Sequence, residues 1–528
     1  MTWESLTQTW HFVEKWAEAR PQAEALAFEA DRLTWTDFKS RMDLTAKAFL
    51  DIGVKRGDRI AMLSMARTEF LTTFMAAGKV GAVWLGLSPK FSLDELLYLL
   101  GDCQPSVLIT LRRHMGSDLR PVIGTLMEEF SCLKKVLVIG EPFEATEGFS
   151  EFAYHQRYHL NSDLEARCRK VADQDPTLLL YTSGSTGKPK GVLHTHSSIV
   201  ENIKVEVKKF YFDDRSRGLI HFPVNHVASV VELGFAGIMA GGFLMCMDKF
   251  DPAETLKMIQ KESITHLGQI PAMFLLQFKD PQFARTDLNS VKYFLWAGAA
   301  APKLMVAVLS QICEKTGAAM LTGYGSTEVC GFVTYTEKGD DLDKLIHTAG
   351  KIAPPFELKV VNLDRRELPD GEVGEVAVRG PFLMKGYYNK PEATKAVISE
   401  DGWYYTSDLA FKDPDGYIHL AGRASEMYKS GGENVYPREI EEVIESHESI
   451  LFAAVIAVPD EVYQEVGWAF SMLRSGKDVS EDELREFCKS KLANFKVPKR
   501  FFVRPLLPLL PNGKIDKVAL RKEIHEVG

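Results

Sequence analysis

The chain has 528 residues, which is more than one hydrophobic core usually serves, so two or three domains are expected. Hydrophobic residues make up 45% and charged residues 26%, a balance that excludes a disordered or fibrous protein. The 63 Lys and Arg against 72 Asp and Glu leave a formal charge of −9, which disfavours nucleic acid as a partner because phosphates require a basic surface.

Cysteine usage and hydropathy indicate a cytoplasmic protein. The cysteines stand at positions 103, 132, 168, 246, 313, 330 and 488. They form no CxxC pair, so neither a disulfide framework nor a structural zinc site is predicted. The N-terminus lacks the basic start and apolar run of a secretory signal. The longest apolar stretch, 227–247, contains Glu232 and is broken at Gly241, so we interpret it as a buried helix and strand and expect no transmembrane segment.

In chain order, the first part alternates strands with helices. Residues 33–50 predict an amphipathic helix opened by a threonine-rich cap. The segment GDRIAML predicts a strand, residues 68–79 a helix, and GAVWLGLS another strand. Further strands are predicted at 106–110, 136–140, 219–224, 243–247, 264–271 and 292–298. This alternation indicates layered, mostly parallel α/β structure.

From about residue 350 the pattern changes. The short strands FELKVVN, GEVAVRG and GYIHLAG, separated by turns such as PDGEVG, predict a β-rich unit. The last hundred or so residues combine a glycine-rich loop, a helix, the strand FAAVIAV, a helix at 479–492 and a basic tail. We therefore expect an α/β fold with a large N-terminal domain, 1–424, of layered subdomains and a β-rich unit. A small α+β domain, 425–528, follows it.

The most informative stretch is YTSGSTGKPKG, Tyr181–Gly191, which follows an apolar strand. Its glycines let backbone amides face phosphate oxygens, its hydroxyls can donate to them, and its lysines offset their charge. The candidate phosphate-binding residues are Thr182, Ser183, Gly184, Ser185, Thr186, Gly187 and Lys188. A mobile surface loop is the alternative. The loop is not a Walker A motif, because Thr182 stands where Gly is required and Pro189 follows Lys188, so a kinase or P-loop ATPase is disfavoured.

Four further segments accompany this loop. They are YGSTE (Tyr324–Glu328), TSDLA (Thr406–Ala410), GRASEMYKSGGENVYPREIE from Gly422, and PNGKIDK (Pro511–Lys517). In order and spacing, all five resemble the motifs of the adenylate-forming superfamily, which includes acyl-CoA synthetases, peptide-synthetase adenylation domains and firefly-type luciferases. The resemblance spans nearly the whole chain.

This resemblance implies that a carboxylic acid and ATP form an acyl-adenylate, whose acyl group then passes to the thiol of coenzyme A. Because charge accumulates on phosphoryl oxygens, cations and donors should do most of the catalysis. By resemblance, Lys514 bridges the carboxylate and the α-phosphate, and Thr327 donates to that phosphate. Glu328 is implied to bind magnesium (Mg2+), which takes oxygen ligands. The alternative for Lys514 is a surface lysine in a basic tail.

The same resemblance implies a nucleotide site. Tyr324, beside Gly325, would lie against one face of the adenine. The small residues on its other face are Gly298, Ala299 and Ala300, although tight packing is an alternative explanation for them. Asp408 would accept both ribose hydroxyls, and Arg423 would also contact the nucleotide. A buried structural salt bridge is the competing interpretation of Asp408 and Arg423.

The acyl pocket is expected near His226, a candidate catalytic residue that aligns with an aromatic or histidine position at the acyl pocket of the superfamily. The candidate substrate-binding residues are His226, Val227, Val230, Trp296, Gly298, Val329, Cys330 and Gly331. Mostly apolar walls indicate an uncharged acyl tail, and Trp296 would shorten the pocket to suit a medium-chain, cyclic or aromatic acid. The spacing of His194, His196 and His221 matches no metal motif, and we interpret His194 and His196 as local packing.

Two half-reactions at one site imply a moving domain. By resemblance, the C-terminal domain rotates about Ser425 after adenylation and presents Gly431 and Gly432 to the pantetheine arm of coenzyme A. The hinge is commonly Asp or Lys in the superfamily, so Ser425 leaves its detailed interactions open. The alternative for the glycines is a turn that enters a helix.

Three functions remain in competition: a CoA ligase, a stand-alone adenylation enzyme that loads a carrier protein, and a non-enzymatic binding relative. The third is disfavoured because every motif residue is present. Since no carrier domain follows Lys514, we predict an AMP-forming carboxylate–CoA ligase, with carrier loading as the alternative. The expected partners are a small-molecule carboxylic acid, ATP and coenzyme A, with no nucleic acid and with a homodimer left open.

Overall fold

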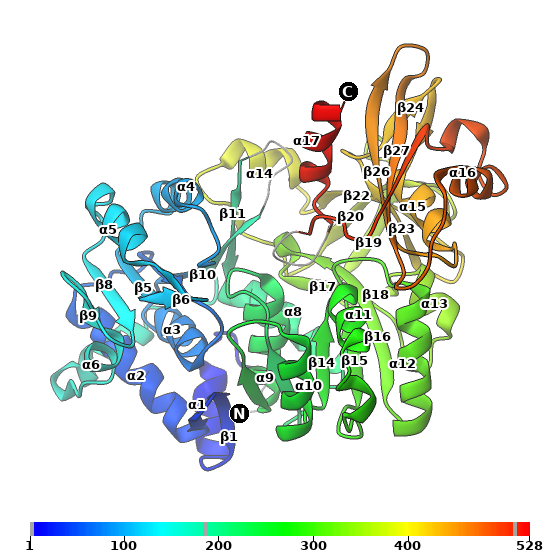
Figure 1. The fold of residues 1–528 in the computed structure, drawn as a ribbon. Coiled ribbons are helices and arrows are strands. Elements are labelled where there is room, and N and C mark those ends of the chain that lie inside the picture. The colour runs from blue at the N-terminus through cyan, green and yellow to red at the C-terminus, as the bar shows by residue number, and fades with distance from the viewer. Residues whose placement is uncertain (1–4, 183–187, 510–514, 528) are drawn as a thin grey trace.

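The computed structural model of the chain describes residues 5–182, 188–509 and 515–527. Two large sheets dominate it (Figure 1). The eight-stranded sheet has the order β21 (Gly386–Tyr387), β11 (Lys190–Thr195), β10 (Pro176–Thr182), β4 (Val83–Leu87), β3 (Arg59–Leu63), β5 (Val107–Leu111), β8 (Lys135–Ile139) and β9 (Glu147–Gly148). Its strands from β10 to β9 are parallel, with α3 (Thr68–Lys79) connecting β3 to β4.

The nine-stranded sheet lies beside it and is mostly parallel as well. Its order is β18 (Lys351–Ile352), β17 (Gly331–Tyr335), β16 (Ala319–Ser326), β15 (Tyr293–Trp296), β14 (His266–Gln269), β12 (Arg217–Ile220), β13 (Phe243–Cys246), β1 (Glu24–Phe28) and β2 (Asp31–Thr34). The predicted strands in both sheets are present within a few residues, which confirms the α/β layers.

Local sequence signals explain where several elements begin. Helix α2 (Trp35–Asp51) starts after Thr34, because the Thr34 hydroxyl accepts from the amide of Asp37 while the Asp37 carboxylate accepts from the amide of Thr34. The apolar stretch 227–247 is a buried π-helical segment, η3 (Ala228–Phe235), followed by α9 (Ala236–Ala240) and β13, as expected. Within the described ranges, no helix is both long and apolar enough to span a bilayer.

A four-stranded antiparallel sheet follows, and it confirms the predicted β-rich unit. Its strands are β19 (Glu357–Val361), β20 (Gly374–Arg379), β22 (Tyr404–Lys412) and β23 (Ile418–Arg423). Residues 424–426 form a turn, and Ser425 is exposed in it. The predicted division at 424/425 falls in this turn, and an independently moving C-terminal domain stays a prediction.

The C-terminal part has its own sheet and core, at one end of the molecule (orange to red in Figure 1). Its strands are β24 (Tyr428–Ser430), β25 (Glu433–Val435), β26 (Ile450–Asp460), β27 (Gln464–Leu473) and β28 (Arg500–Arg504), and its helices are α15 (Pro437–Glu445), α16 (Glu481–Lys489) and α17 (Lys517–Val527). Tyr428, Ile440 and Phe501 are buried in one cluster between α15, α16 and the sheet. Helix α15 also contacts β23 of the large part.

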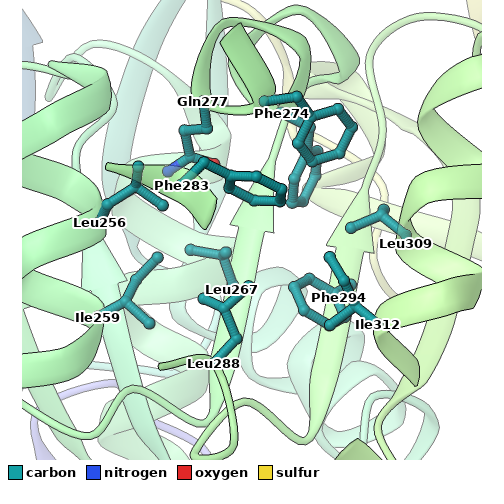
Figure 2. A pocket seen from close by; sticks show the side chains of 11 residues that line it. Leu256, Ile259, Leu267, Phe274, Gln277, Phe283, Leu288, Phe294, Leu309 and Ile312 are labelled. Atoms are coloured by element: carbon teal, nitrogen blue, oxygen red, sulfur yellow. The ribbon is translucent and has the colours of Figure 1, made fainter. Parts of the chain in front are cut away.

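Figure 2 shows a small cavity between α10 (Pro252–Lys261), α11 (Pro271–Lys279) and α12 (Lys303–Thr316), where phenyl and aliphatic side chains point toward one another. Its volume of about 10 Å³ is at the lower limit for one water molecule. Phe274 and Phe294 belong to the second apolar cluster of the large part. We therefore assign this cavity to core packing.

Candidate active site

The carboxyl ends of β12, β14, β15 and β16 meet at one edge of the nine-stranded sheet, the edge at which open α/β sheets bind ligands. Beyond β15, Gly298 has a φ of 83° and is exposed together with Ala299 and Ala300. Beyond β16 comes the short turn η5 (Thr327–Val329). The predicted adenine and phosphate segments therefore leave neighbouring strands on the same edge.

Three predicted nucleotide-binding residues from separate motifs contact one another. The Tyr324 hydroxyl donates to Oδ2 of Asp408 over 2.6 Å, and Nε of Arg423 lies 3.1 Å from Oδ1 of Asp408. Burial and the neighbouring Asp408 raise the pKa of Tyr324, so the phenol keeps its proton and donates. The charge of Asp408 raises the pKa of Arg423. The sequence placed these residues in one site, and the structure brings them together.

A buried histidine, His194, holds the turn that carries Thr327. Nε2 of His194 lies 2.7 Å from the Thr327 carbonyl oxygen. Burial lowers the pKa of His194 to about 4, so the ring is neutral near pH 7. Because a carbonyl only accepts, Nε2 carries the proton, and Nδ1 lies 3.2 Å from the Ser198 hydroxyl. The interpretation of His194 as local packing therefore misses its contact with a motif residue.

Asn202 on α8 (His196–Lys209) holds the backbone that follows Thr327, from the turn into β17. Nδ2 of Asn202 donates to the carbonyl oxygens of Val329 and Phe332, over 2.9 and 3.0 Å. Gly325 faces the same segment so closely that a Cβ there would lie 1.8 Å from the carbonyl oxygen of Gly331. The segment 325–332 is therefore fixed by backbone packing and by side chains from α8.

The predicted magnesium ligand, Glu328, is half-buried and lies next to Tyr387. The Tyr387 hydroxyl is 3.1 Å from Oε1 of Glu328, and the amide of Met384 donates to the Glu328 carbonyl over 2.9 Å. Among the residues that the structure describes, no three His, Cys, Asp or Glu side chains gather as a metal site. A single hard carboxylate suits Mg2+ that takes its other ligands from phosphate and water, so the residues present fit the predicted role.

The glycine- and serine-rich loop joins β10 to β11 as an antiparallel hairpin in which Thr182 pairs with Lys190. Residues 183–187 lie outside the described residues. Lys188 is exposed with its ammonium 5.8 Å from the ring of Tyr98, while the Lys190 ammonium lies 5.0 Å from the ring of Tyr387. Tyr387 therefore contacts both this hairpin and Glu328, which connects the first motif to the second.

The predicted acyl-pocket residues divide between clusters. Val227, Val230 and Cys330 are buried in the largest apolar cluster. Val329 packs with Tyr324 in another. Trp296 lies in the cluster around the cavity of Figure 2, so the structure does not bring its indole together with Val227 or Cys330. Its role in shortening the pocket stays a prediction.

His226 stands at the entrance to η3. It is half-buried, and its Nδ1 accepts from the amide of Ala228 over 3.2 Å. Its ring stacks with that of Phe222 at a centroid distance of 6.5 Å. A role for His226 in the acyl pocket stays a prediction.

The predicted CoA-binding glycines occupy a different local structure from the helix-entry turn considered above. Gly431 and Gly432, with φ of 60° and 91°, form the two-residue turn of the β24–β25 hairpin, and α15 begins only at Pro437. No described heavy atom lies within 4 Å of a Cβ placed on Gly432. Lys514 lies outside the described residues, although Leu509 and Ile515 on either side of its segment pair as an antiparallel bridge.

Four buried residues around the segment 325–332 were not predicted from the sequence. They are His194, Asn202, Glu206 and Tyr387. A signal for two of them was present, because Ser198, Asn202 and Glu206 recur every four residues on an otherwise apolar face of α8. Tyr387 carried no comparable signal, since its contacts depend on tertiary structure.

Comparison with known proteins agrees with this geometry. Residues 13–388 match the AMP-binding enzyme family, and residues 439–514 match the AMP-binding enzyme C-terminal domain. The chain belongs to the AMP-binding enzyme family. The predicted adenylate-forming superfamily and the class of ATP-dependent, AMP-forming acid–thiol ligases, which use ATP, Mg2+ and coenzyme A, are thereby confirmed.

Individual relatives of this AMP-binding enzyme cover nearly all of it. It is 32% identical to a feruloyl-CoA synthase of an Amycolatopsis species, over 96% of this chain and 97% of the relative. It is 31% identical to the long-chain-fatty-acid–CoA ligase FadD13 of Mycobacterium tuberculosis, over 93% of each. An anthranilate CoA ligase, AuaEII, shares the fold with a TM-score of 0.87 at 24% identity, over 99% of both chains.

Proposed function

We propose that this AMP-binding enzyme is an acyl-CoA synthetase that converts a carboxylate, ATP and coenzyme A into acyl-CoA, AMP and pyrophosphate through an acyl-adenylate. The observation that carries the proposal is the contact of Tyr324, Asp408 and Arg423, which come from three motifs, beside the supported turn at Thr327. A ribose diol suits the Asp408 carboxylate, because each of its oxygens has a second lone pair after accepting from the protein.

Adenylation begins when a carboxylate oxygen attacks the α-phosphorus and the bond to pyrophosphate breaks. In this proposal Thr327 donates to an α-phosphate oxygen, while Lys514 neutralises charge shared by the carboxylate and that phosphate. The hairpin residues Thr182 and Lys188 contact the leaving phosphates. Glu328 would hold Mg2+, and the ion would neutralise charge on the phosphates. The buried His194 keeps Thr327 in place throughout.

Thioester formation follows at the same site. We propose that the C-terminal domain turns about Ser425 and brings Gly431 and Gly432 to the pantetheine arm. The CoA sulfur then attacks the acyl carbon, the bond to the AMP oxygen breaks, and the thiol proton leaves to solvent. The open space around Gly432 supports this role, because a close backbone approach requires a residue without a side chain.

The acid that we propose is medium-chain, cyclic or aromatic. The buried apolar side chains of Val227, Val230 and Cys330 support a largely apolar pocket. Seven free thiols support a reducing cytoplasmic location, where ATP and coenzyme A are available.

An acid-by-thiol panel tests the function. The enzyme is assayed for AMP and pyrophosphate with benzoate, cyclohexane carboxylate, hexanoate and palmitate, each with coenzyme A and with a carrier protein. We expect AMP rather than ADP, and CoA thioesters rather than carrier thioesters. ADP as the product would refute the mechanism, carrier loading would identify the alternative acceptor, and palmitate as the fastest acid would reject the proposed acid class.

A further inference from the structure

Behind the predicted acyl-pocket residues lies a group of buried oxygen atoms without donors. On α8, Asn202 is fully buried and Glu206 is 1% exposed. Oδ1 of Asn202 and Oε2 of Glu206 have no hydrogen-bond partner among the described residues. A buried acceptor that loses water without gaining a donor is destabilising, so two of them at one place need an explanation.

These oxygens converge on Gly331. A methyl group placed on Gly331 would lie 3.2 Å from Oε2 of Glu206, 3.4 Å from Oδ1 of Asn202 and 3.5 Å from Cγ of Glu232. Gly331 is a predicted substrate-binding residue, and it follows Cys330 directly. The missing side chain at Gly331 therefore lets both acceptors lie close to the backbone of a predicted substrate-binding residue.

Helical segment η3 contributes a third residue near Gly331, Glu232. Glu232 is half-buried there, about one turn beyond Val227, and it supplies a second carboxylate beside Glu206. Burial and the charge of Glu232 raise the pKa of Glu206 well above its usual range. Burial and the charges of both acids raise the pKa of the Cys330 thiol, which places all three groups in one electrostatic environment.

The sequence predicted mostly apolar pocket walls around an uncharged acyl tail, and Glu206 and Glu232 add carboxyl groups that this prediction did not include. Asn202 is oriented by its Nδ2, which donates to Val329 and Phe332, so its Oδ1 is left as an acceptor. Even with the proton that the raised pKa of Glu206 favours, acceptor oxygens outnumber donors among Asn202 Oδ1 and the carboxyl groups of Glu206 and Glu232. A ligand that ends in a hydrocarbon would leave Oδ1 of Asn202 and Oε2 of Glu206 unpaired, whereas a ligand with a donor would satisfy them.

We infer that the acid substrate carries a hydrogen-bond donor, a hydroxyl or an amino group, at the end remote from its carboxylate, and that Glu206, Glu232 and Asn202 bind it in front of Gly331. This inference rests on the proposed acyl-CoA synthetase function and adds the chemical class of its acid. Glu206 and Asn202 are specificity-determining residues in this assignment, since they touch the acyl tail and not the reacting atoms.

Matched acids test the inference in the wild-type enzyme, so the test does not depend on whether a variant folds. The pairs are 4-hydroxybenzoate or 4-aminobenzoate against 4-methylbenzoate, 4-hydroxycinnamate against 4-methylcinnamate, and 6-hydroxyhexanoate against heptanoate. We expect the donor-bearing acid of at least one pair to have a kcat/KM for pyrophosphate release about ten-fold or more above its methyl analogue, because buried polar groups reject a ligand that cannot pair with them. Methyl analogues that match or exceed their partners in every pair would overturn the inference.

A variant then assigns the preference to the buried acid. Glu206→Gln should reduce the ratio of donor to methyl acid about ten-fold, because the amide presents a donor where the carboxyl accepted. Glu201→Gln is the matched control, since Glu201 lies on the same helix and pairs with Lys204 at 2.7 Å. An unchanged ratio in folded Glu206→Gln would overturn the assignment. Methyl acids that turn over rapidly refute only this inference, whereas absence of AMP with every acid would refute the proposed function as well.

Discussion

The segment 325–332 and the C-terminal domain are attached to the molecule in opposite ways. The segment is held by buried side chains that bond its backbone, such as His194 to Thr327 and Asn202 to Val329. The C-terminal domain is joined by a turn at 424–426 and packs Leu451 into a cluster that contains Leu345. A region held at several of its carbonyls suits the binding of a nucleotide, whereas a domain with its own core and a turn as its connection suits rotation.

The largest effect is expected at Lys514, on the side of the proposed moving domain. Lys514→Ala should slow adenylate formation by about 10²–10³-fold, as does loss of a single charge-stabilising group elsewhere. Thioester formation from supplied acyl-AMP should remain largely intact, because the two steps use different poses. Pyrophosphate release and single-turnover transfer measure the two steps separately. Lys522→Ala, an exposed lysine on α17, is the control, and equal losses in both steps would contradict the division.

The next effect concerns the fixed segment. His194→Ala should lower kcat for adenylation about ten- to a hundred-fold and cost about 1–3 kcal/mol in the free energy of unfolding, because the Thr327 carbonyl loses its buried donor. His194→Gln should restore part of kcat, since its amide can donate to the same oxygen. Pyrophosphate-release kinetics and urea unfolding provide the two readouts. The exposed His159→Ala is the control. An unchanged kcat in His194→Ala would show that the segment 325–332 keeps its position without the hydrogen bond from His194.

A smaller effect, on the KM for ATP, is expected at Asp408, which contacts Tyr324 of the large part and Arg423 next to the turn at 424–426. Asp408→Asn should raise the KM for ATP about ten-fold, because Arg423 loses its ionic partner while Tyr324 keeps an acceptor. Initial rates against ATP concentration measure it. Asp415→Asn, exposed in the turn between β22 and β23, serves as the control. A KM within two-fold of the wild type would argue against nucleotide contact at this carboxylate.

The smallest effect at neutral pH is on stability. Burial lowers the pKa of His194 and His266 to about 4 and of His196 and His221 to about 3, and all four lie in the large part. Unfolded histidine binds a proton below about pH 6.5. The unfolded state therefore takes up more protons between that pH and 4, so stability falls on acidification, by up to about 1.4 kcal/mol per pH unit for each ring.

Urea unfolding at pH 7.5 and 5.5 checks this slope. Neither ring nitrogen of His221 has a hydrogen-bond partner among the described residues, so His221→Phe should reduce the pH dependence while leaving turnover at pH 7.5 near that of the wild type. An unchanged slope in this variant would show that His221 makes no contribution to acid sensitivity.

Most of the fold was predictable from the sequence because its signals are local. The alternation of strands and helices gave the parallel layers, and the Thr34 cap fixed the start of α2 to within two residues. The motif residues Tyr324, Asp408 and Arg423 were predicted to share a site, and the structure brings Tyr324 and Arg423 into contact with Asp408. Such predictions succeed because hydrophobic periodicity and the order of the motifs can be read directly along the sequence.

The supporting contacts were not predictable in the same way. His194 lies 133 residues from its partner Thr327, and Asn202 lies 127 residues from Val329. The contact of Tyr387 with Glu328 likewise depends on which strands pair at the edge of the eight-stranded sheet. Buried acids such as Glu206 are masked in a sequence by the apolar residues around them, and only packing reveals what they face.

The π-helical winding of η3 has a consequence for how this enzyme group diversifies. Such a segment accommodates one residue more per turn than a regular helix, so removal of a single residue ahead of Glu232 would tighten the coil and rotate that carboxylate by roughly 100°. One deletion would then turn the Glu232 carboxylate away from the proposed acyl pocket and leave an apolar lining, while the nucleotide-binding segments stay unchanged.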